Sequence, residues 1–263
     1  MTSLKEKYGD WALITGASSG IGREFAKYFA DERFNLVLVA RRIERLEELA
    51  AELKEKNKIE VICVQADLGK DDFLPKILEK IKNVEISVLI NNAGSGSSGR
   101  FETVDTEKEI DLVKLNCLAP LILTHHFSRV MIKKGKGAII FLGSLVGFQP
   151  NPFITTYAAT KAFNIMMGSA LWYELKKYNI DVLSLSPGGT HTEFIRAGKT
   201  DSKLIVAEPE DVVKTAVKAL GKKPSVVHGF VNKTMVKISR LLPIKYSVKL
   251  AGHISGSINK LAK

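Results

Sequence analysis

Tyr157 and Lys161 have the side chains and the spacing for acid–base chemistry, because they stand four positions apart in the segment Tyr-Ala-Ala-Thr-Lys. Side chains at this spacing share one face of a helix. A free phenol, with a pKa of about 10, donates protons poorly near neutral pH, but a neighbouring ammonium favours the phenolate and lowers that pKa. The hydroxyl of Ser144, upstream of this pair, could hydrogen-bond a carbonyl oxygen and stabilise its developing charge. These three residues predict proton transfer to an oxygen, which hydride reduction of a carbonyl requires.

A second pair, Tyr173 and Lys177, has the same spacing, so the spacing alone is not specific. Position in the predicted fold separates the two pairs. Ser144 follows the predicted strand 138–142, at the sheet edge where open α/β sheets bind ligands, and Tyr157 begins the next helix beside it. Tyr173 lies roughly four turns further along that helix. We therefore expect Tyr173 to have a structural role.

A glycine-rich turn joins the apolar run 11–15 to a segment with helical spacing, 21–31. Glycine lets the backbone turn sharply and approach a pyrophosphate, and the helix start behind it offers free N–H groups and the positive end of a dipole. The spacing Gly-x3-Gly-x-Gly differs from the common dinucleotide fingerprint, but its place between a strand and a helix indicates a phosphate-binding loop. We expect the cofactor to contact Gly16, Ser18, Ser19, Gly20, Ile21 and Gly22.

Arg41 and Arg42 follow the next predicted strand, 35–40. A carboxylate at this point would accept a hydrogen bond from a ribose 2′-hydroxyl and repel a 2′-phosphate, whereas a guanidinium pairs with phosphate. We therefore predict NADP(H) as the cofactor, with Arg41 on its 2′-phosphate. For Arg42, an exposed position at the start of a helix is the simpler expectation.

Predicted strands and helices alternate along most of the chain, and some strands, such as 35–40, are apolar throughout. Such strands are buried on both faces, as in a parallel sheet covered by helices. The pattern predicts an α/β fold with a doubly wound, Rossmann-like parallel sheet in a single domain. The predicted strands are 11–15, 35–40, 59–64, 86–90, 138–142, 180–185 and 226–231, and the predicted helices are 21–31, 43–56, 71–82, 106–133, 154–178 and 209–221.

With these motifs in this order, the sequence resembles the short-chain dehydrogenase/reductase superfamily in its compact form, over roughly residues 8–231. The turn 15–22 resembles the family's cofactor loop. Asn116, Ser144, Tyr157 and Lys161 match its catalytic tetrad. Further matches are Asp67 at the position that holds the adenine, Asn92, Ala93 and Gly94 after the fourth strand, and Pro187, Gly188, Thr190 and Thr192 in the loop that clasps the nicotinamide.

The resemblance implies how the matched residues act. Asn116 would hold a water that links Lys161 to solvent as a proton relay, and the nicotinamide would lie beside Tyr157 and Lys161. It also implies a homodimer or homotetramer. The sequence shows no pattern of metal ligands, so we expect no metal site.

All of the excess positive charge lies near the C-terminus. The chain carries 39 basic and 28 acidic residues, a net charge of +11, but its last acidic residue is Asp211. This distribution argues against nucleic-acid binding. Apolar and basic residues alternate with helical spacing in residues 231–263, which predicts a basic amphipathic helical tail after a catalytic domain at 1–230. The tail could cover the body as a lid, dock a partner or lie on an anionic membrane surface.

Composition favours a cytoplasmic location. The chain has 263 residues with 45% hydrophobic and 25% charged side chains, enough for a sizeable core. Two cysteines are too few for a disulfide scaffold and suit a reducing compartment. The N-terminus is too polar for a signal peptide. Together with the tail, these features predict a cytoplasmic protein that could associate with membranes.

The sequence thus predicts an NADP(H)-dependent oxidoreductase that transfers a hydride between nicotinamide and a small carbonyl or secondary alcohol. The segments 94–101, 145–154 and 189–206 are expected to shape the substrate site, because loops at the ligand edge vary while the scaffold stays. A ketoacyl reductase acting on acyl-carrier-protein thioesters, with the carrier on the basic tail, remains an alternative. The other alternative is a membrane-surface interaction protein that uses its nucleotide site as a sensor.

Overall fold

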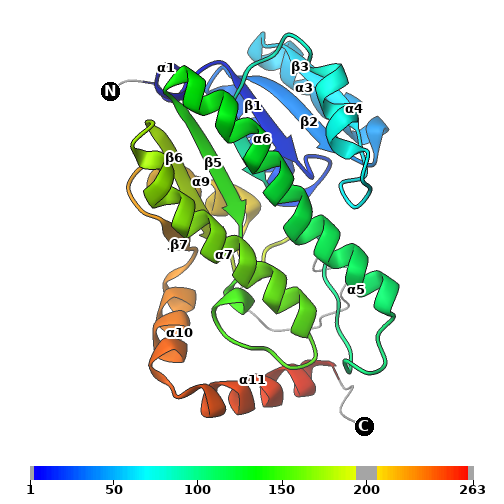
Figure 1. Ribbon diagram of the computed structural model, residues 1–263, viewed down its shortest axis with the longest axis vertical. Coiled ribbons are helices and arrows are strands. Elements are labelled where there is room, and N and C mark those ends of the chain that lie inside the picture. The colour runs from blue at the N-terminus through cyan, green and yellow to red at the C-terminus, as the bar shows by residue number, and fades with distance from the viewer. Residues whose placement is uncertain (1–2, 194–205, 260–263) are drawn as a thin grey trace.

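The computed structural model describes residues 3–193 and 206–259, and these form a parallel sheet between two layers of helices (Figure 1). Within the described residues the sheet has seven strands in the order β3-β2-β1-β4-β5-β6-β7. The strands are β1 (Trp11–Thr15), β2 (Asn35–Ala40), β3 (Val61–Gln65), β4 (Ile86–Asn91), β5 (Gly137–Leu142), β6 (Ile180–Ser186) and β7 (Ser225–Val227). The order reverses between β1 and β4, so the predicted doubly wound, Rossmann-like fold is confirmed.

The helices follow the predicted alternation with several changes at their ends. They are α1 (Leu4–Tyr8), α2 (Gly20–Asp31), α3 (Ile43–Asn57), α4 (Phe73–Lys80), α5 (Thr106–Val113), the π-turn η1 (Lys114–Leu118), α6 (Ala119–Lys134), the 3₁₀-turn η2 (Leu145–Phe148), α7 (Thr155–Lys176), α9 (Pro209–Ala219), α10 (Phe230–Leu241) and α11 (Ile244–Asn259). The short helix α1 was not predicted. Its signal is a capping box, in which Ser3 and Glu6 each accept a hydrogen bond from the other's backbone amide.

Two apolar cores fill the space between the sheet and its helices. Side chains alternate between them along each strand, so that Ile14 faces α2, α3 and α9, whereas Leu13 faces α4, α6 and α7. Both residues are fully buried. This burial on both faces explains the continuous apolar runs in the sequence.

Two predicted elements differ from the structure. The single predicted helix 106–133 is interrupted by the π-turn η1, a local irregularity that the apolar spacing does not reveal. The predicted strand 226–231 ends at Val227, because Gly229 adopts a positive φ of 85° and α10 begins at Phe230. The chain then bends at Pro243, between α10 and α11.

The tail helices pack against the loop that follows β5. Ser247 of α11 donates a hydrogen bond to the side chain of Gln149 at 3.1 Å, and the guanidinium of Arg240 in α10 lies 4.9 Å from the ring centroid of Phe148. Figure 1 shows both helices at the end of the molecule opposite α3 and α4. The inner face of the tail therefore packs on the rest of the folded chain.

Candidate active site

The carboxyl ends of β1, β4, β5 and β6 meet at one edge of the sheet, and each is followed by a predicted site segment. The glycine turn follows β1, Asn92 follows β4, Ser144 follows β5, and Pro187 follows β6. Because every strand pair is parallel, these segments converge. The edge is where open α/β sheets bind ligands.

Tyr157 and Lys161 lie on one face of α7, as their spacing predicts. The Nζ atom of Lys161 is 5.8 Å from the centroid of the Tyr157 ring. It donates a hydrogen bond to the carbonyl oxygen of Leu142, the last residue of β5, at 3.0 Å. With only 7% of its surface exposed, the lysine holds its ammonium between helix and sheet.

Burial changes the acidity of both side chains. It raises the pKa of Tyr157 from its usual 10.0 to about 12, and a hydrogen bond with Ser144 acts in the opposite direction. Burial also lowers the pKa of Lys161 from 10.5 to about 8. The sequence predicts a phenol acidified by the ammonium, whereas the structure gives a raised phenol pKa because the phenolate loses its hydration. At neutral pH the phenol therefore keeps its proton.

Ser144 lies beside the tyrosine at the start of η2. Its hydroxyl forms the hydrogen bond with Tyr157 that lowers the phenol pKa, and its Oγ is 3.5 Å from the backbone N of Val146, a long cap contact. The amide of Leu145 donates to the carbonyl of Pro187 at 3.1 Å. These contacts tie the Ser144 loop to the loop that follows β6.

Asn116 joins the site through the π-turn η1. Pro120 has no N–H, so the carbonyl of Asn116 cannot receive the usual α-helical hydrogen bond from four positions on. It accepts instead from the side-chain amide of Asn164 at 2.9 Å. The Asn116 side chain donates to Thr160 at 3.0 Å and accepts from the Ser95 amide at 3.0 Å. Asn116 is 1% exposed, so the turn and its partners fix its position.

Gly94 brings the asparagine and the lysine together. A Cβ atom at Gly94 would lie 3.1 Å from Oδ1 of Asn116 and 3.5 Å from Nζ of Lys161. Glycine thus leaves space next to both groups. The four residues that match the family tetrad and the glycine after β4 form one cluster.

The glycine turn is held against β4 by Thr15 and Asn92. The Thr15 hydroxyl accepts from the backbone amides of Asn92 and Ala93 at 2.9 and 3.0 Å, and the Asn92 side chain donates to the Thr15 carbonyl at 2.8 Å. Gly16 adopts a positive φ of 67°, and a Cβ at Gly22 would lie 2.3 Å from the Gly16 carbonyl oxygen. Both glycines are therefore required by the tight turn into α2.

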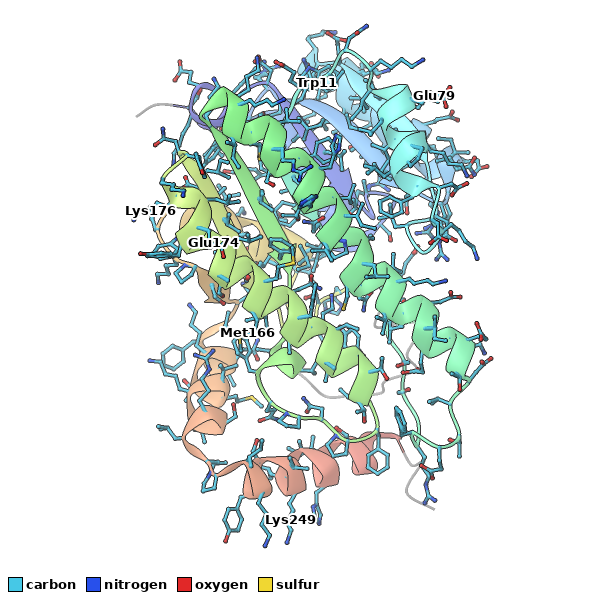
Figure 2. The ribbon with its side chains drawn as sticks, viewed as in Figure 1. Trp11, Glu79, Met166, Glu174, Lys176 and Lys249 are labelled. Atoms are coloured by element: carbon cyan, nitrogen blue, oxygen red, sulfur yellow. The ribbon has the colours of Figure 1, made fainter. Side chains whose placement is uncertain are left out.

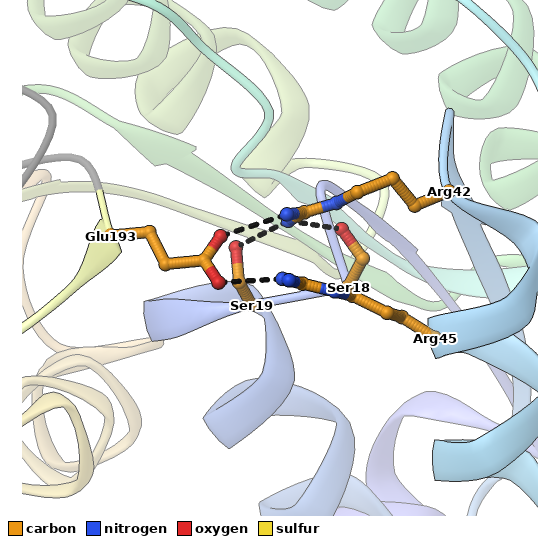
Figure 3. Close-up of polar contacts among 5 residues, drawn as sticks. All are labelled: Ser18, Ser19, Arg42, Arg45 and Glu193. Carbon is orange, nitrogen blue, oxygen red and sulfur yellow. Dashed lines mark hydrogen bonds and ion pairs between the residues drawn. The ribbon is translucent and has the colours of Figure 1, made fainter.

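Arg42 crosses the glycine turn, contrary to the simple expectation of an exposed helix start. Its Nη2 atom donates to the hydroxyls of Ser18 and Ser19, both at 3.1 Å. Its Nη1 atom pairs with Glu193 at 2.9 Å, and Arg45 pairs with the other oxygen of Glu193 at 2.5 Å. Figure 3 shows the two guanidiniums side by side, with the carboxylate opposite them. The arginines lower the pKa of Glu193, which is thus a carboxylate at neutral pH.

Arg41 and Asp67 line a hollow of about 610 Å³ at the ends of β2 and β3. Its wall continues along Ser95 and into α5. Asp67 follows β3, where its carboxylate accepts from the Gly69 amide at 3.0 Å. The two residues predicted to contact the adenosine half of the cofactor therefore border one space.

The loop after β6 approaches the start of α2. Thr190 is buried and donates to the Gly188 carbonyl at 3.2 Å, and Thr192 donates to the Thr190 carbonyl at 3.2 Å. A Cβ at Gly20 would lie 2.8 Å from Cγ2 of Thr192. Of the predicted substrate segment 189–206, residues 194–205 lie outside the described residues.

Comparison with known proteins decides the family. A family model described as short chain dehydrogenase matches residues 10–203. The chain belongs to the short-chain dehydrogenase/reductase family. It is 33% identical over 238 residues to a 7β-hydroxysteroid dehydrogenase of Clostridium sardiniense, covering 89% of this chain and 91% of the relative.

Solved structures of this family agree with the fold. A structure from work on 7β-hydroxysteroid dehydrogenase stereoselectivity superposes with a TM-score of 0.89 and 28% identity, covering 95% of this chain and 99% of its own. A short-chain dehydrogenase of Sphingobium yanoikuyae in complex with NADPH gives a TM-score of 0.78 and 35% identity, covering 88% and 93%. The predicted family and its oxidoreductase activity on CH–OH or C=O groups are confirmed.

A nicotinamide cofactor fits the residues at this edge of the short-chain dehydrogenase fold. The hydroxyl of Ser19, at the N-cap of α2, makes no cap hydrogen bond and faces Arg42 instead. The first turn of α2 carries no acidic residue. Free N–H groups of the helix start, two hydroxyls and two guanidiniums are the donors that phosphate groups prefer.

Sequence reasoning missed several residues that the structure adds to the site. Arg45 and Glu193 join Arg42 at the glycine turn, and Asn164 supports Asn116. Arg45 lies in the first turn of α3, four positions after Arg41 in the sequence, and this spacing was an available signal. Tyr173 is 79% exposed, which agrees with its expected exclusion from the site.

The described residues give two further facts about the chain as a whole. Within 3–193 and 206–259, no helix is long and apolar enough to cross a membrane. Cys63 and Cys117 are free thiols.

Proposed function

We propose that the chain is an NADP(H)-dependent reductase of ketones or aldehydes, and the reverse dehydrogenase of secondary alcohols. The observation that carries the proposal is the cluster of Tyr157, Lys161, Ser144 and Asn116 at the ligand edge of the sheet. Each of these side chains has a role that its contacts support.

In the proposed reduction, Ser144 donates a hydrogen bond to the substrate carbonyl and Tyr157 transfers its proton to the same oxygen. The cofactor, when bound, supplies the hydride for the carbonyl carbon. Tyr157 is protonated at neutral pH, so it is in the form that a reduction needs. The ammonium of Lys161 favours the phenolate left behind.

Asn116 keeps the proton path in position in this proposal. Its backbone carbonyl is directed out of the helical ladder and toward Asn164, while its side chain is fixed by Thr160 and Ser95. A water held in this region would connect Lys161 to solvent and return the proton. The roles of Asn116 and Lys161 are therefore positioning and relay.

The preference for NADP(H) rests on the cationic groups at the glycine turn. Arg42 already binds both loop hydroxyls, and Arg41 lines the hollow beside Asp67. A 2′-phosphate would find a guanidinium on each side, which NAD(H) could not use. The NADPH complex of the Sphingobium relative supports the same cofactor.

For the substrate, we propose a bulky apolar carbonyl or secondary alcohol. The tail packs against Phe148 and Gln149, only a few residues from Ser144, and so forms a wall near the carbonyl position. A hydroxysteroid is the first candidate because relatives named as 7β-hydroxysteroid dehydrogenases match over most of the chain. Acyl thioesters are the second candidate.

An assay panel tests this function. The purified chain is mixed with NADPH or NADH and with ketosteroids, quinones, free acyl ketones, carrier-bound acyl ketones or sugar ketones, and the loss of reduced-cofactor absorbance is followed. We expect turnover with NADPH and an apolar ketone. Turnover of only carrier-bound ketones would favour the acyl-carrier alternative. Binding of NADPH without turnover of any carbonyl would favour a nucleotide sensor.

We also propose that the protein forms a homodimer or homotetramer through α5, α6 and α7. Leu121, Met166 and Tyr173 are exposed on α6 and α7, and Leu118 is exposed at the end of η1. Figure 2 shows Met166 on the ribbon of α7. A second copy of the chain would cover this apolar face. Light scattering of the wild type and of Leu121→Glu tests the interface, with a shift to monomers expected in the variant.

The outer face of the tail supports a further proposal, contact with an anionic membrane surface. Val231, Met235 and Ile238 form an exposed apolar stripe on α10, with 53%, 56% and 54% of their surfaces exposed. Lys237 and Lys249 are also exposed, and Lys249 projects from α11 away from the body (Figure 2). Exposed apolar side chains beside lysines complement anionic lipids.

A further inference from the structure

Glu193 connects two parts of the site that are far apart in the sequence. It lies in the loop after β6, whereas its partners Arg42 and Arg45 lie at the start of α3. Each carboxylate oxygen pairs with a different guanidinium, at 2.9 and 2.5 Å. The carboxylate thus bridges the arginines as a bidentate anion would.

The same guanidinium of Arg42 also faces the glycine turn. It donates to Ser18 and Ser19 while it pairs with Glu193 (Figure 3). A phosphate that approached these two hydroxyls would meet the guanidinium that the carboxylate binds through its other nitrogen, Nη1. Carboxylate and phosphate oxygens accept from guanidinium in the same geometry, so the two anions compete for this guanidinium.

We propose that Glu193 is an internal competitor for the 2′-phosphate of NADP(H), and so sets how strongly the site prefers NADP(H) over NAD(H). This inference rests on the proposed function. NADP(H) must displace the carboxylate from Arg42 and Arg45, whereas NAD(H) can bind with both ion pairs intact. Glu193 therefore weakens NADP(H) binding selectively.

The effect is measurable but moderate, because the three charged side chains are about half exposed, 42% for Arg42, 44% for Arg45 and 50% for Glu193. Ion pairs at such exposure are weakened by solvent. Removing the carboxylate should increase the affinity for a 2′-phosphorylated ligand about three- to tenfold.

Calorimetric titration of the full chain tests the inference without turnover. Wild type and Glu193→Gln are titrated with NADP⁺ and NAD⁺, and with the fragments adenosine 2′,5′-bisphosphate and 5′-AMP. We expect tighter binding of both 2′-phosphorylated ligands in the variant, with less than about a twofold change for NAD⁺ and 5′-AMP. Glu193→Asp keeps the charge on a shorter side chain and should fall between wild type and Glu193→Gln.

Glu208→Gln is the matched control. Glu208 is an exposed carboxylate near the same loop, and it contacts His191 at 3.7 Å rather than the arginines. The control removes the same charge, so a general electrostatic effect would change its NADP⁺ affinity as much as that of Glu193→Gln. An equal gain in Glu208→Gln, or an unchanged ratio of the NADP⁺ and NAD⁺ affinities in Glu193→Gln, would overturn the inference.

The outcomes separate this inference from the proposed function. If wild type prefers NADP⁺ and Glu193→Gln shows the same preference, the role of Glu193 as a competitor is refuted, while the proposed function stands. Wild type that binds NAD⁺ better than NADP⁺ would refute the proposed cofactor. If Glu193→Gln then came to prefer NADP⁺, the competitor would stand as the reason for the NAD⁺ preference.

Discussion

The ammonium of Lys161 lies 5.8 Å from the ring centroid of Tyr157, while its hydrogen bond is to the carbonyl of Leu142. The two side chains are close enough for their charges to interact through a buried environment. Burial moves their pKa values apart, up to about 12 for the phenol and down to about 8 for the ammonium. At neutral pH both groups hold their protons, which suits donation to a substrate oxygen.

Tyr157→Phe should abolish most turnover and leave cofactor binding nearly intact. The substitution removes the proton donor but keeps the ring, and loss of a general acid lowers rates by about 10²- to 10⁴-fold. Steady-state kinetics with the best carbonyl from the panel measure kcat, and calorimetry measures the Kd for NADP⁺.

Tyr173→Phe is the matched control, because Tyr173 has the same spacing to a lysine but is 79% exposed. Its kcat should stay within about twofold of wild type. Full activity in Tyr157→Phe would show that another group donates the proton.

Lys161 should make stability depend on pH between about 8 and 10.5. The pKa of Lys161 is lowered in the folded chain from 10.5 to about 8. In this window the unfolded chain binds more protons than the folded chain, so the free energy of unfolding rises with pH, by about 3 kcal/mol at most. Below pH 8 the buried lysine stays charged, and the desolvation of this charge lowers the free energy of unfolding by its full amount.

Lys161→Met should lose this rise, as measured by urea unfolding from pH 7.5 to 10.5. Above pH 10 the raised pKa of Tyr157 acts in the opposite direction, since the folded chain then holds the additional proton. Lys177→Met removes an exposed lysine just after the same helix and should keep the wild-type profile. If the free energy of unfolding of Lys161→Met rises with pH as steeply as that of wild type, other groups cause the rise.

The contrast between Tyr157 and Asn116 shows what the sequence can and cannot predict. The strands, the glycine turn and the position of Tyr157 follow from apolar runs, glycine spacing and the meeting of parallel strands at one edge. The π-turn around Asn116 depends on Pro120 and on a hydrogen bond from Asn164, 48 positions further along the chain. Local spacing carries no signal for a partner so distant.

Glu193 illustrates the same limit for charges. Its ion pairs with Arg42 and Arg45 join residues 151 and 148 positions apart, so the sequence alone could not distinguish a bridged arginine from one exposed at a helix start. The pKa of Tyr157 depends likewise on how completely the surrounding loops bury it. Long-range packing, rather than motif identity, sets the electrostatics of this site.

Arg42→Met should reduce the preference for NADPH over NADH. A charge-assisted hydrogen bond to phosphate contributes about 1.5–3 kcal/mol, so we expect the ratio of kcat/KM values for the two cofactors to fall about 10- to 100-fold. Arg41→Asp should shift the same ratio further, because a carboxylate repels the 2′-phosphate. Arg129→Met, at an exposed position on α6, is the control. Unchanged ratios in both variants would remove these arginines from cofactor recognition.

Charge reversal on the tail should weaken its proposed membrane contact. In Lys237→Glu/Lys249→Glu, two exposed lysines of α10 and α11 become acidic, and each basic residue near an anionic surface contributes about 1 kcal/mol of binding. Flotation with vesicles of phosphatidylserine and phosphatidylcholine should show at least about a tenfold lower bound fraction than wild type. The control Lys80→Glu/Lys82→Glu changes the same net charge on and just after α4, at the opposite end of the molecule (Figure 1). If wild type does not float with these vesicles, the outer face of the tail has no affinity for an anionic bilayer and its lysines face water.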